Sequence, residues 1–224
     1  MAPRVIGDTP KFMVVIATIL ITWTWNVGIA RSAGNYEHHH DPLIKDTIED
    51  VFFEILHPPE LSYTYRIRPT EDFGTRFNDS FSGRKIALVP VEPETGCRKP
   101  DNIEKLDGNV ALVWRGDCTF FQKSAIAEDS GAKAIIVADY HTKSIDDERE
   151  SPMWMDYYYI EMTSGDNDRK RNINIPAGFL LGKNGRIIRD TLRRLKLPHA
   201  IINIPVNLTF SPITDFHQPP WVAL

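Results

Sequence analysis

The central part of the chain, residues 108–140, alternates apolar runs with a helical pattern and predicts a strand, a turn, a helix and a second strand. Residues 109–114 are a short apolar run typical of a buried strand, and residues 115–117 turn the chain. Thr119 is a good helix N-cap. The residues that follow it at helical spacing are Phe120, Lys123, Ser124 and Ala127. Residues 134–138 are a second buried run, so we expect two parallel strands joined by a crossover helix.

Further strands and a second helix follow from the same kind of pattern. The expected strands are the short apolar or alternating runs 51–56, 61–68, 85–89, 175–181 and 200–206. Residues 186–195 predict an amphipathic helix. We expect its apolar face to carry Ile187, Ile188, Thr191, Leu192 and Leu195. We expect its outer face to carry Arg186, Arg189, Arg193 and Arg194.

A spaced set of residues in the central unit resembles the signature of the protease-associated (PA) domain family. The matching residues are Arg115, Gly116, Cys118, Phe120 and Lys123, followed by Ala127, Gly131, Ala132, Ala134, Ile135 and Ile136. The resemblance extends over about residues 51–221. Segments 54–58, 175–182, 197–207 and 218–221 are similar to small secreted members that consist of one such domain.

This resemblance implies an α/β fold with a β-rich core, an open barrel or a sandwich, flanked by helices and containing the strand–helix–strand unit. It also implies a non-catalytic module that binds proteins or peptides or controls the access of substrate. Because fold does not fix function, the expected activity is less specific than the expected fold. The expected organisation is a signal peptide at 1–30, a polar N-terminal arm at 31–50, a PA domain at 51–210 and a proline-containing C-terminal tail at 211–224.

The first thirty residues predict a signal peptide. Arg4 and Lys11 precede an apolar run at 12–25, and small residues end at Ala30, where we expect cleavage. The run is shorter than the roughly 20 residues of a membrane span. An uncleaved signal anchor is the alternative. We therefore expect a secreted, extracellular protein with no membrane span after cleavage.

Secretion affects the interpretation of the cysteines and of two sequons. Cys97 and Cys118 are the only cysteines, and an even pair in an oxidising compartment predicts a disulfide. A catalytic thiol is the alternative. Asn78 and Asn207 each begin an Asn-x-Ser/Thr sequon, so we expect N-glycosylation at both.

Composition and motifs narrow the expected chemistry. The net charge of −4 comes from 26 basic and 30 acidic side chains mixed along the chain, which disfavours nucleic acid as a partner. The histidine run 38–40 could bind a metal, but adjacent side chains rarely converge, so we interpret it as part of the polar arm. No nucleophile elbow, metalloprotease helix or phosphate-binding loop occurs. We expect no catalytic site, metal or cofactor. An unrecognised secreted hydrolase, or a structural or carrier glycoprotein without a specific partner, remains an alternative.

Two segments are candidates for binding an extracellular or secretory-pathway protein or peptide. The first is the turn 115–118, which carries Arg115 and Asp117; its Arg-Gly-Asp sequence also admits a role in cell adhesion. The second is the aromatic segment 153–159, whose candidate contact residues are Trp154, Tyr157, Tyr158 and Tyr159. Trp, Tyr and Met are enriched at protein interfaces. The alternative is that this segment contributes to the core.

Overall fold

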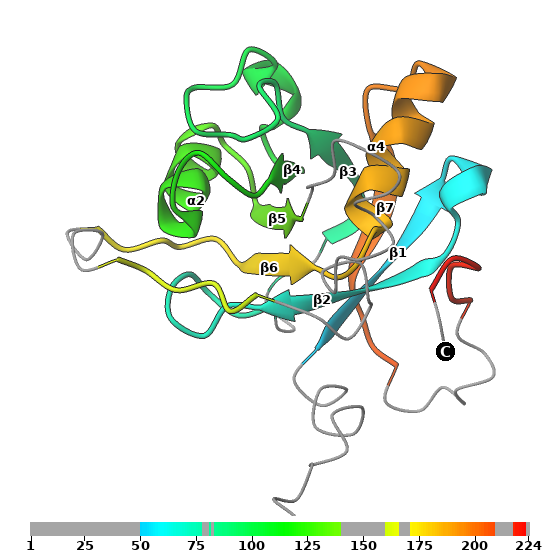
Figure 1. Cartoon of the computed structure of the whole chain (residues 1–224), viewed down its shortest axis with the longest axis horizontal. Coiled ribbons are helices and arrows are strands. Elements are labelled where there is room, and N and C mark those ends of the chain that lie inside the picture. The colour runs from blue at the N-terminus through cyan, green and yellow to red at the C-terminus, as the bar shows by residue number, and fades with distance from the viewer. Residues whose placement is uncertain are drawn as a thin grey trace, which may run out of the picture. The chain divides into compact units, whose positions relative to one another are not determined.

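The strands of the protein close into a barrel. The computed structural model describes residues 50–77, 81, 83–139, 160–165, 171–208 and 217–222. Within them the strands are β1 (Val51–His57), β2 (Thr64–Pro69), β3 (Gly83–Pro90), β4 (Val110–Trp114), β5 (Ala134–Ala138), β6 (Ala177–Leu180) and β7 (Ala200–Val206). Their order around the barrel is β1-β2-β6-β5-β4-β3-β7 (Figure 1). The predicted β-rich core with flanking helices is confirmed, whereas the sheet is closed and not an open barrel or a sandwich.

One part of the barrel is parallel and the other is antiparallel. Strands β3, β4, β5 and β6 pair in parallel, while the remaining pairs, β1–β2, β1–β7, β2–β6 and β3–β7, are antiparallel. The predicted parallel pairing of the two central strands is confirmed in the register Val110↔Ala134 to Trp114↔Ala138. Because parallel strands end at the same edge of a sheet, the segments that leave the carboxyl ends of β3, β4 and β5 come together there.

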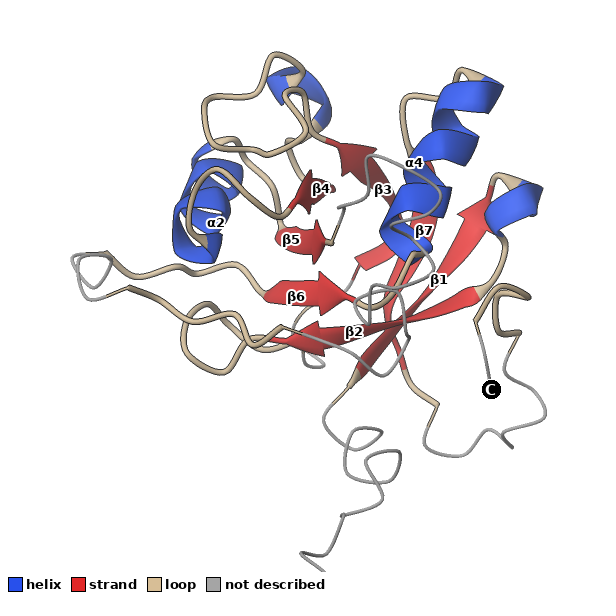
Figure 2. Ribbon diagram, in the orientation of Figure 1, coloured by secondary structure: helices blue, strands red, loops and turns tan. Residues whose placement is uncertain are grey.

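Two α-helices flank the barrel, α2 (Phe120–Asp129) and α4 (Asn184–Leu195), as Figure 2 shows. The start of α2 is set by a capping box, since the Thr119 hydroxyl accepts from the amide of Gln122 while the Gln122 side chain accepts from the amide of Thr119. Two 3₁₀ turns, η1 (Pro59–Leu61) and η2 (Ile103–Lys105), complete the described helical segments.

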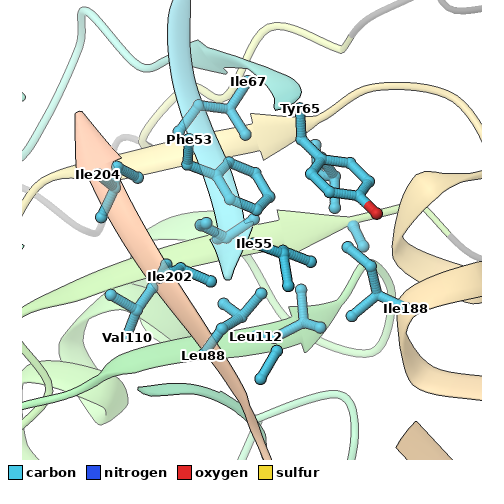
Figure 3. Packing of buried hydrophobic residues seen from close by; sticks show 14 of the residues in the cluster. Phe53, Ile55, Tyr65, Ile67, Leu88, Val110, Leu112, Ile188, Ile202 and Ile204 are labelled. Carbon is cyan, nitrogen blue, oxygen red and sulfur yellow. The ribbon is translucent and has the colours of Figure 1, made fainter. Parts of the chain in front are cut away.

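The barrel interior and the α2 side of the sheet are separate hydrophobic layers. Alternate residues of β4 face opposite ways: Val110 and Leu112 belong to the interior cluster, Ala111 and Val113 to the cluster beneath α2. Both faces of β4 are buried, which explains its uninterrupted apolar run. Labelled interior residues in Figure 3 are Phe53, Ile55, Tyr65, Ile67, Leu88, Val110, Leu112, Ile188, Ile202 and Ile204.

Helix α4 closes one end of the barrel interior. Its Ile188 packs with the interior residues of the strands (Figure 3). Its first turn approaches the carboxyl ends of β4 and β5 so closely that a Cβ on Gly185 would lie 2.3 Å from the Cβ of Ala138 and 2.9 Å from the ring of Trp114. The close approach therefore requires glycine at position 185.

Several details of the predicted elements are corrected by the structure. The strand expected at 61–68 begins at Thr64, because the chain first makes the turn η1. Arg189, expected on the outer face of its helix, is buried. The expected signal peptide, the histidine run and all of the polar arm except Asp50 lie outside the described residues. Within the described residues, no helix has both the length and the apolar character needed to cross a membrane.

Candidate functional site

Residues from three segments meet at the carboxyl edge of the parallel strands, and we call them the carboxyl-edge site. The site consists of residues 94–97 after β3, the turn 115–118 after β4, and Asp139 after β5. Backbone hydrogen bonds align these segments, since the Trp114 amide donates to the Glu94 carbonyl at 2.8 Å and the Arg115 amide donates to the Ala138 carbonyl at 2.9 Å. The turn is therefore attached to the loops on both sides of it.

The turn needs unusual backbone conformations. Gly116 has φ of +108° and Asp117 has φ of +65°. A Cβ on Gly116 would meet nothing within 4 Å, so glycine is favoured at this position by its φ and not by crowding. Aspartate is among the few other residues that enter the left-handed region with little penalty. The turn therefore presents the exposed side chains of Arg115 and Asp117 on a backbone that the local sequence favours.

The ammonium group of Lys123 is buried beneath the turn, although the side chain belongs to the helix that follows it. Lys123 is only 1% exposed. Its Nζ donates to the carbonyl of Thr95 at 2.5 Å and to the carbonyl of Gly116 at 2.6 Å, and it lies 3.2 Å from Cys97 Sγ. Burial lowers the pKa of Lys123 to about 8, and the nearby charge of Asp117 opposes this shift in part.

A disulfide joins the same two segments as Lys123. It links Cys97, on the loop after β3, to Cys118, at the end of the turn. The predicted bridge is thus present, and no free cysteine remains. The sequence pattern predicts Lys123 at helical spacing but indicates no partner for it. The position of a cation on the buried side of a helix could have indicated that Lys123 contacts hydrogen-bond acceptors, because a buried charge needs partners.

Arg115 pairs with Asp139 across the ends of β4 and β5. The guanidinium Nη1 lies 3.5 Å from Asp139 Oδ2; the Arg115 side chain is 43% exposed, whereas that of Asp139 is buried. A half-exposed ion pair of this length contributes little to stability. Arg115 therefore keeps much of its side chain accessible to a partner.

On its other side the loop after β3 contacts helix α4. Glu94 accepts from Arg189 Nη1 at 3.3 Å and also from Arg193. Arg189 further donates from Nε to Asp190 at 2.8 Å, and its guanidinium carbon lies 5.1 Å from the ring centroid of Trp114. This combination of ion pairs and a cation–π contact explains why Arg189 is buried.

The structure brings together some of the predicted site residues. Arg115, Asp117, Cys97 and Cys118 all belong to the carboxyl-edge site. Asn207 is exposed directly after β7. The predicted residues that lie outside the described part of the chain are Asn78, Trp154, Tyr157, Tyr158 and Tyr159.

The aromatic segment 153–159 lies outside the described residues. Of the residues that follow it, Met162 is buried in the cluster beneath α2, and its carbonyl accepts from the Thr70 hydroxyl at 2.8 Å. Among the described residues, no group of three or more His, Cys, Asp or Glu side chains has a metal-binding arrangement.

Comparisons with known sequences place the central part of this chain in one family. The family model for the PA domain matches residues 85–188. A Drosophila melanogaster protein named "PRADC1-like protein" is 50% identical over 174 residues, which cover 78% of this chain and 82% of the relative.

More distant relatives match this chain over a small part of their own length. The human "ER degradation-enhancing alpha-mannosidase-like protein 3" is 33% identical over 52% of this chain but only 12% of the relative. The Arabidopsis thaliana "Signal peptide peptidase-like 5" is 26% identical over 66% of this chain and 24% of the relative.

Among solved structures, an aminopeptidase from Aneurinibacillus sp. strain AM-1 is similar to 70% of this chain, with 15% identity and a TM-score of 0.42, over 30% of the aminopeptidase chain. The identity and the extent of the match to the Drosophila protein, together with the match to the family model, are decisive. The chain belongs to the PA domain family.

Proposed function

We propose that this protein is a secreted, non-catalytic PA domain protein that binds a protein or peptide partner at its carboxyl-edge site. The observation that carries the proposal is the turn 115–118, which exposes charged side chains on a backbone held by a disulfide, by Lys123 and by a backbone hydrogen bond.

Three contacts preorganise the turn. The disulfide holds its last residue, Lys123 binds the carbonyl of Gly116, and the amide of Arg115 is bonded to the end of β5. Binding costs free energy when a loop must become ordered, and a loop that is already held loses less. The turn is therefore suited to recognition.

The turn presents two opposite charges to a partner. Arg115 and Asp117 carry opposite charges two residues apart, and both are exposed. Such a pair favours a partner that offers an acidic and a basic group at matching spacing, because complementary charges contribute specificity and a faster association rate. We infer an extended peptide or a protein loop as the partner.

We also propose the aromatic segment 153–159, which lies outside the described residues, as part of the binding surface. Its Trp154, Tyr157, Tyr158 and Tyr159 are of the residue types that contribute most to binding at protein interfaces. We therefore include them in the surface.

The relatives support a binding role over a specific reaction. The mannosidase-like and signal-peptide-peptidase-like proteins share with this chain only 12% and 24% of their length, and their names differ widely. A module that occurs in such different proteins is expected to supply recognition or access control, while the chemistry resides in the remainder of each protein.

Secretion is supported by three features of the chain. The first thirty residues have the composition of a signal peptide, the cysteine pair forms a disulfide, and the sequon residue Asn207 is exposed. We expect the secreted chain to begin at Arg31 and to carry N-glycans.

The test begins with the full chain expressed in animal cells and purified from the medium, with its first residue determined by N-terminal sequencing. The immobilised protein then captures partners from extracellular fluid, which are quantified by mass spectrometry. Arg115→Ala, Asp117→Asn and the double variant Trp154→Ala/Tyr158→Ala should each reduce recovery of a specific partner roughly fivefold or more.

The matched controls remove one positive and one negative charge at the opposite edge of the parallel strands. Lys133 is exposed at the amino end of β5, and Glu104 is exposed in η2. Lys133→Ala and Glu104→Gln should leave recovery unchanged. Equal recovery of every partner by the wild type and by all the site variants would refute the proposed surface, and retention of the chain inside the cell would refute secretion.

A further inference from the structure

We propose that the Cys97–Cys118 disulfide is a reducible switch: a dithiol opens it by attack on Cys118, Cys97 leaves as a thiolate held by Lys123, and the domain stays folded. The proposal rests on the contacts of Lys123 and does not depend on the identity of a binding partner.

The Lys123 ammonium group has one more N–H donor than it has carbonyl acceptors. An ammonium group has three N–H donors. Two of them meet the carbonyls of Thr95 and Gly116 at 2.5 and 2.6 Å, and the third acceptor within reach is Cys97 Sγ at 3.2 Å. A disulfide sulfur is a weak acceptor, whereas a thiolate carries a full negative charge. The ammonium group is therefore better satisfied when the bridge is open, which favours the reduced state.

The carbonyl oxygens near Cys97 do not reverse this preference. Cys97 Sγ lies 3.6 Å from the carbonyl oxygens of both Thr95 and Gly116, farther than its 3.2 Å separation from Lys123 Nζ. Both carbonyls already accept hydrogen bonds from the ammonium group. The Lys123 ammonium group is thus closer to this sulfur than either carbonyl oxygen is.

Cys118 has a different environment, which makes it the sulfur that is attacked. Both cysteines are partly exposed, so exposure does not distinguish them, but Cys118 immediately precedes Thr119, the N-cap of α2. The capping box already occupies the amides of Thr119 and Gln122, so the helix start offers less stabilisation to an anion at Cys118 than Lys123 offers to one at Cys97. In thiol–disulfide exchange the sulfur that forms the more stable thiolate is the better leaving group.

The reaction balances as a two-electron exchange. One thiolate of the dithiol attacks Cys118 Sγ, the S–S bond breaks, and its electron pair leaves on Cys97 Sγ. The second thiolate of the dithiol then attacks the first sulfur of the same dithiol, which is bonded to Cys118 in the mixed disulfide. Cys118 is released and takes a proton. The dithiol is oxidised to a disulfide, the protein is reduced to one thiol and one thiolate, and one proton passes to the solvent.

The domain is expected to remain folded because Lys123 duplicates the link that the disulfide makes. Its hydrogen bonds join Thr95, beside Cys97, to Gly116, beside Cys118. The backbone bond from Trp114 to Glu94 joins the same two segments. Reduction would therefore loosen the turn without releasing the loop.

The test uses the purified secreted chain and reduced glutathione, a monothiol that has no second thiol of its own to resolve the mixed disulfide during a short incubation. After a short incubation without denaturant, N-ethylmaleimide blocks the freed thiol and peptide mass spectrometry locates both groups. We expect glutathione on Cys118 and maleimide on Cys97, at least about tenfold in excess over the reverse pattern. An equal or reversed pattern, or a bridge that reacts only after denaturation, would overturn the proposal.

A second arm removes the ammonium group. Lys123→Met should slow reduction by dithiothreitol and abolish the preference for Cys118, whereas the control Lys133→Met should behave as the wild type. If Lys123→Met fails to fold, the glutathione pattern of the wild type still decides which sulfur leaves. The reduced wild-type protein should keep its near-ultraviolet circular dichroism and a cooperative thermal transition, and loss of either would contradict a switch in a folded domain.

Discussion

The loop after β3 lies between two buried cations, and they hold it in different ways. Lys123 of α2 binds main-chain carbonyls, those of Thr95 and Gly116. Arg189 of α4 binds carboxylates, those of Glu94 and Asp190, and also lies over an aromatic ring. Both side chains are buried, at 1% and 5% exposure. The loop is thus fixed from both sides, by backbone recognition on one and by side-chain recognition on the other.

The difference between carbonyl and carboxylate acceptors determines whether a buried cation keeps its proton near neutral pH. Carbonyl groups carry only partial charges, so burial is not fully compensated, and the pKa of Lys123 falls to about 8. Arg189 has two carboxylates, and a guanidinium group stays protonated in proteins. The α2 side of the loop can therefore respond to pH and to reduction, while the α4 side is expected to respond to neither.

The largest effect is expected when both links on the α2 side are removed. Replacing both cysteines by alanine should lower the free energy of unfolding by about 3 kcal/mol. Lys123→Met should lower it by roughly 2 kcal/mol, because two carbonyls lose their donor. The combined variant should lose at least about 1 kcal/mol more than the sum, since each link alone keeps the segments together. Urea denaturation at pH 7 measures all three, with Lys133→Met as the control; strict additivity would show that the links are independent.

A smaller effect is expected from pH, and it should come from the α2 side. The pKa of Lys123 is about 8 in the folded protein and 10.5 for an ordinary lysine, so between these values the unfolded chain binds more protons than the folded one. The stability contribution of this residue therefore rises with pH through that window, by roughly 1 to 2 kcal/mol between pH 7.5 and 9.5. Denaturation of the disulfide-intact protein at both pH values measures it. The Lys123→Met variant should lack this rise; if it shows the same rise, another group is responsible.

The smallest effect is expected on the α4 side. Arg189→Met should lower the free energy of unfolding by about 1 kcal/mol, because the variant loses the contact with Trp114 and one partner of Glu94. Arg193, which also binds Glu94, is the matched control, since its side chain is 62% exposed. Arg193→Met should cost less than about 0.5 kcal/mol. If both variants lose the same free energy of unfolding, burial of Arg189 adds nothing to its contribution to stability.

Local sequence patterns predicted most of the fold. The last strand, 200–206, and the start of α2 after Thr119 are found where they were expected. Such features depend on neighbouring residues: alternation of side chains, N-cap hydrogen bonds and the φ that glycine allows. Closure of the sheet could not be predicted in this way, because it requires β1 to pair with β7 across most of the domain.

The candidate site was predicted in part. The cysteine pair and the turn carrying Arg115 were identified from the sequence, and the structure places them together. Glu94 was missed, because its partner Arg189 is 95 residues away in the chain. Arg189 itself was misassigned, because helical periodicity alone does not show that Trp114 and Glu94 lie against that part of the helix.

The sequence by itself determined the family, the strand–helix–strand unit and the residues available for the bridge, since these depend on residue identity and short-range geometry. The tertiary structure alone decided which acceptors each buried cation meets. Lys123 binds carbonyl groups, which every residue possesses, so no side-chain pattern can mark its partners. Only the folded loop brings those oxygens within hydrogen-bonding distance, and this placement makes one side of the loop sensitive to pH and to reduction.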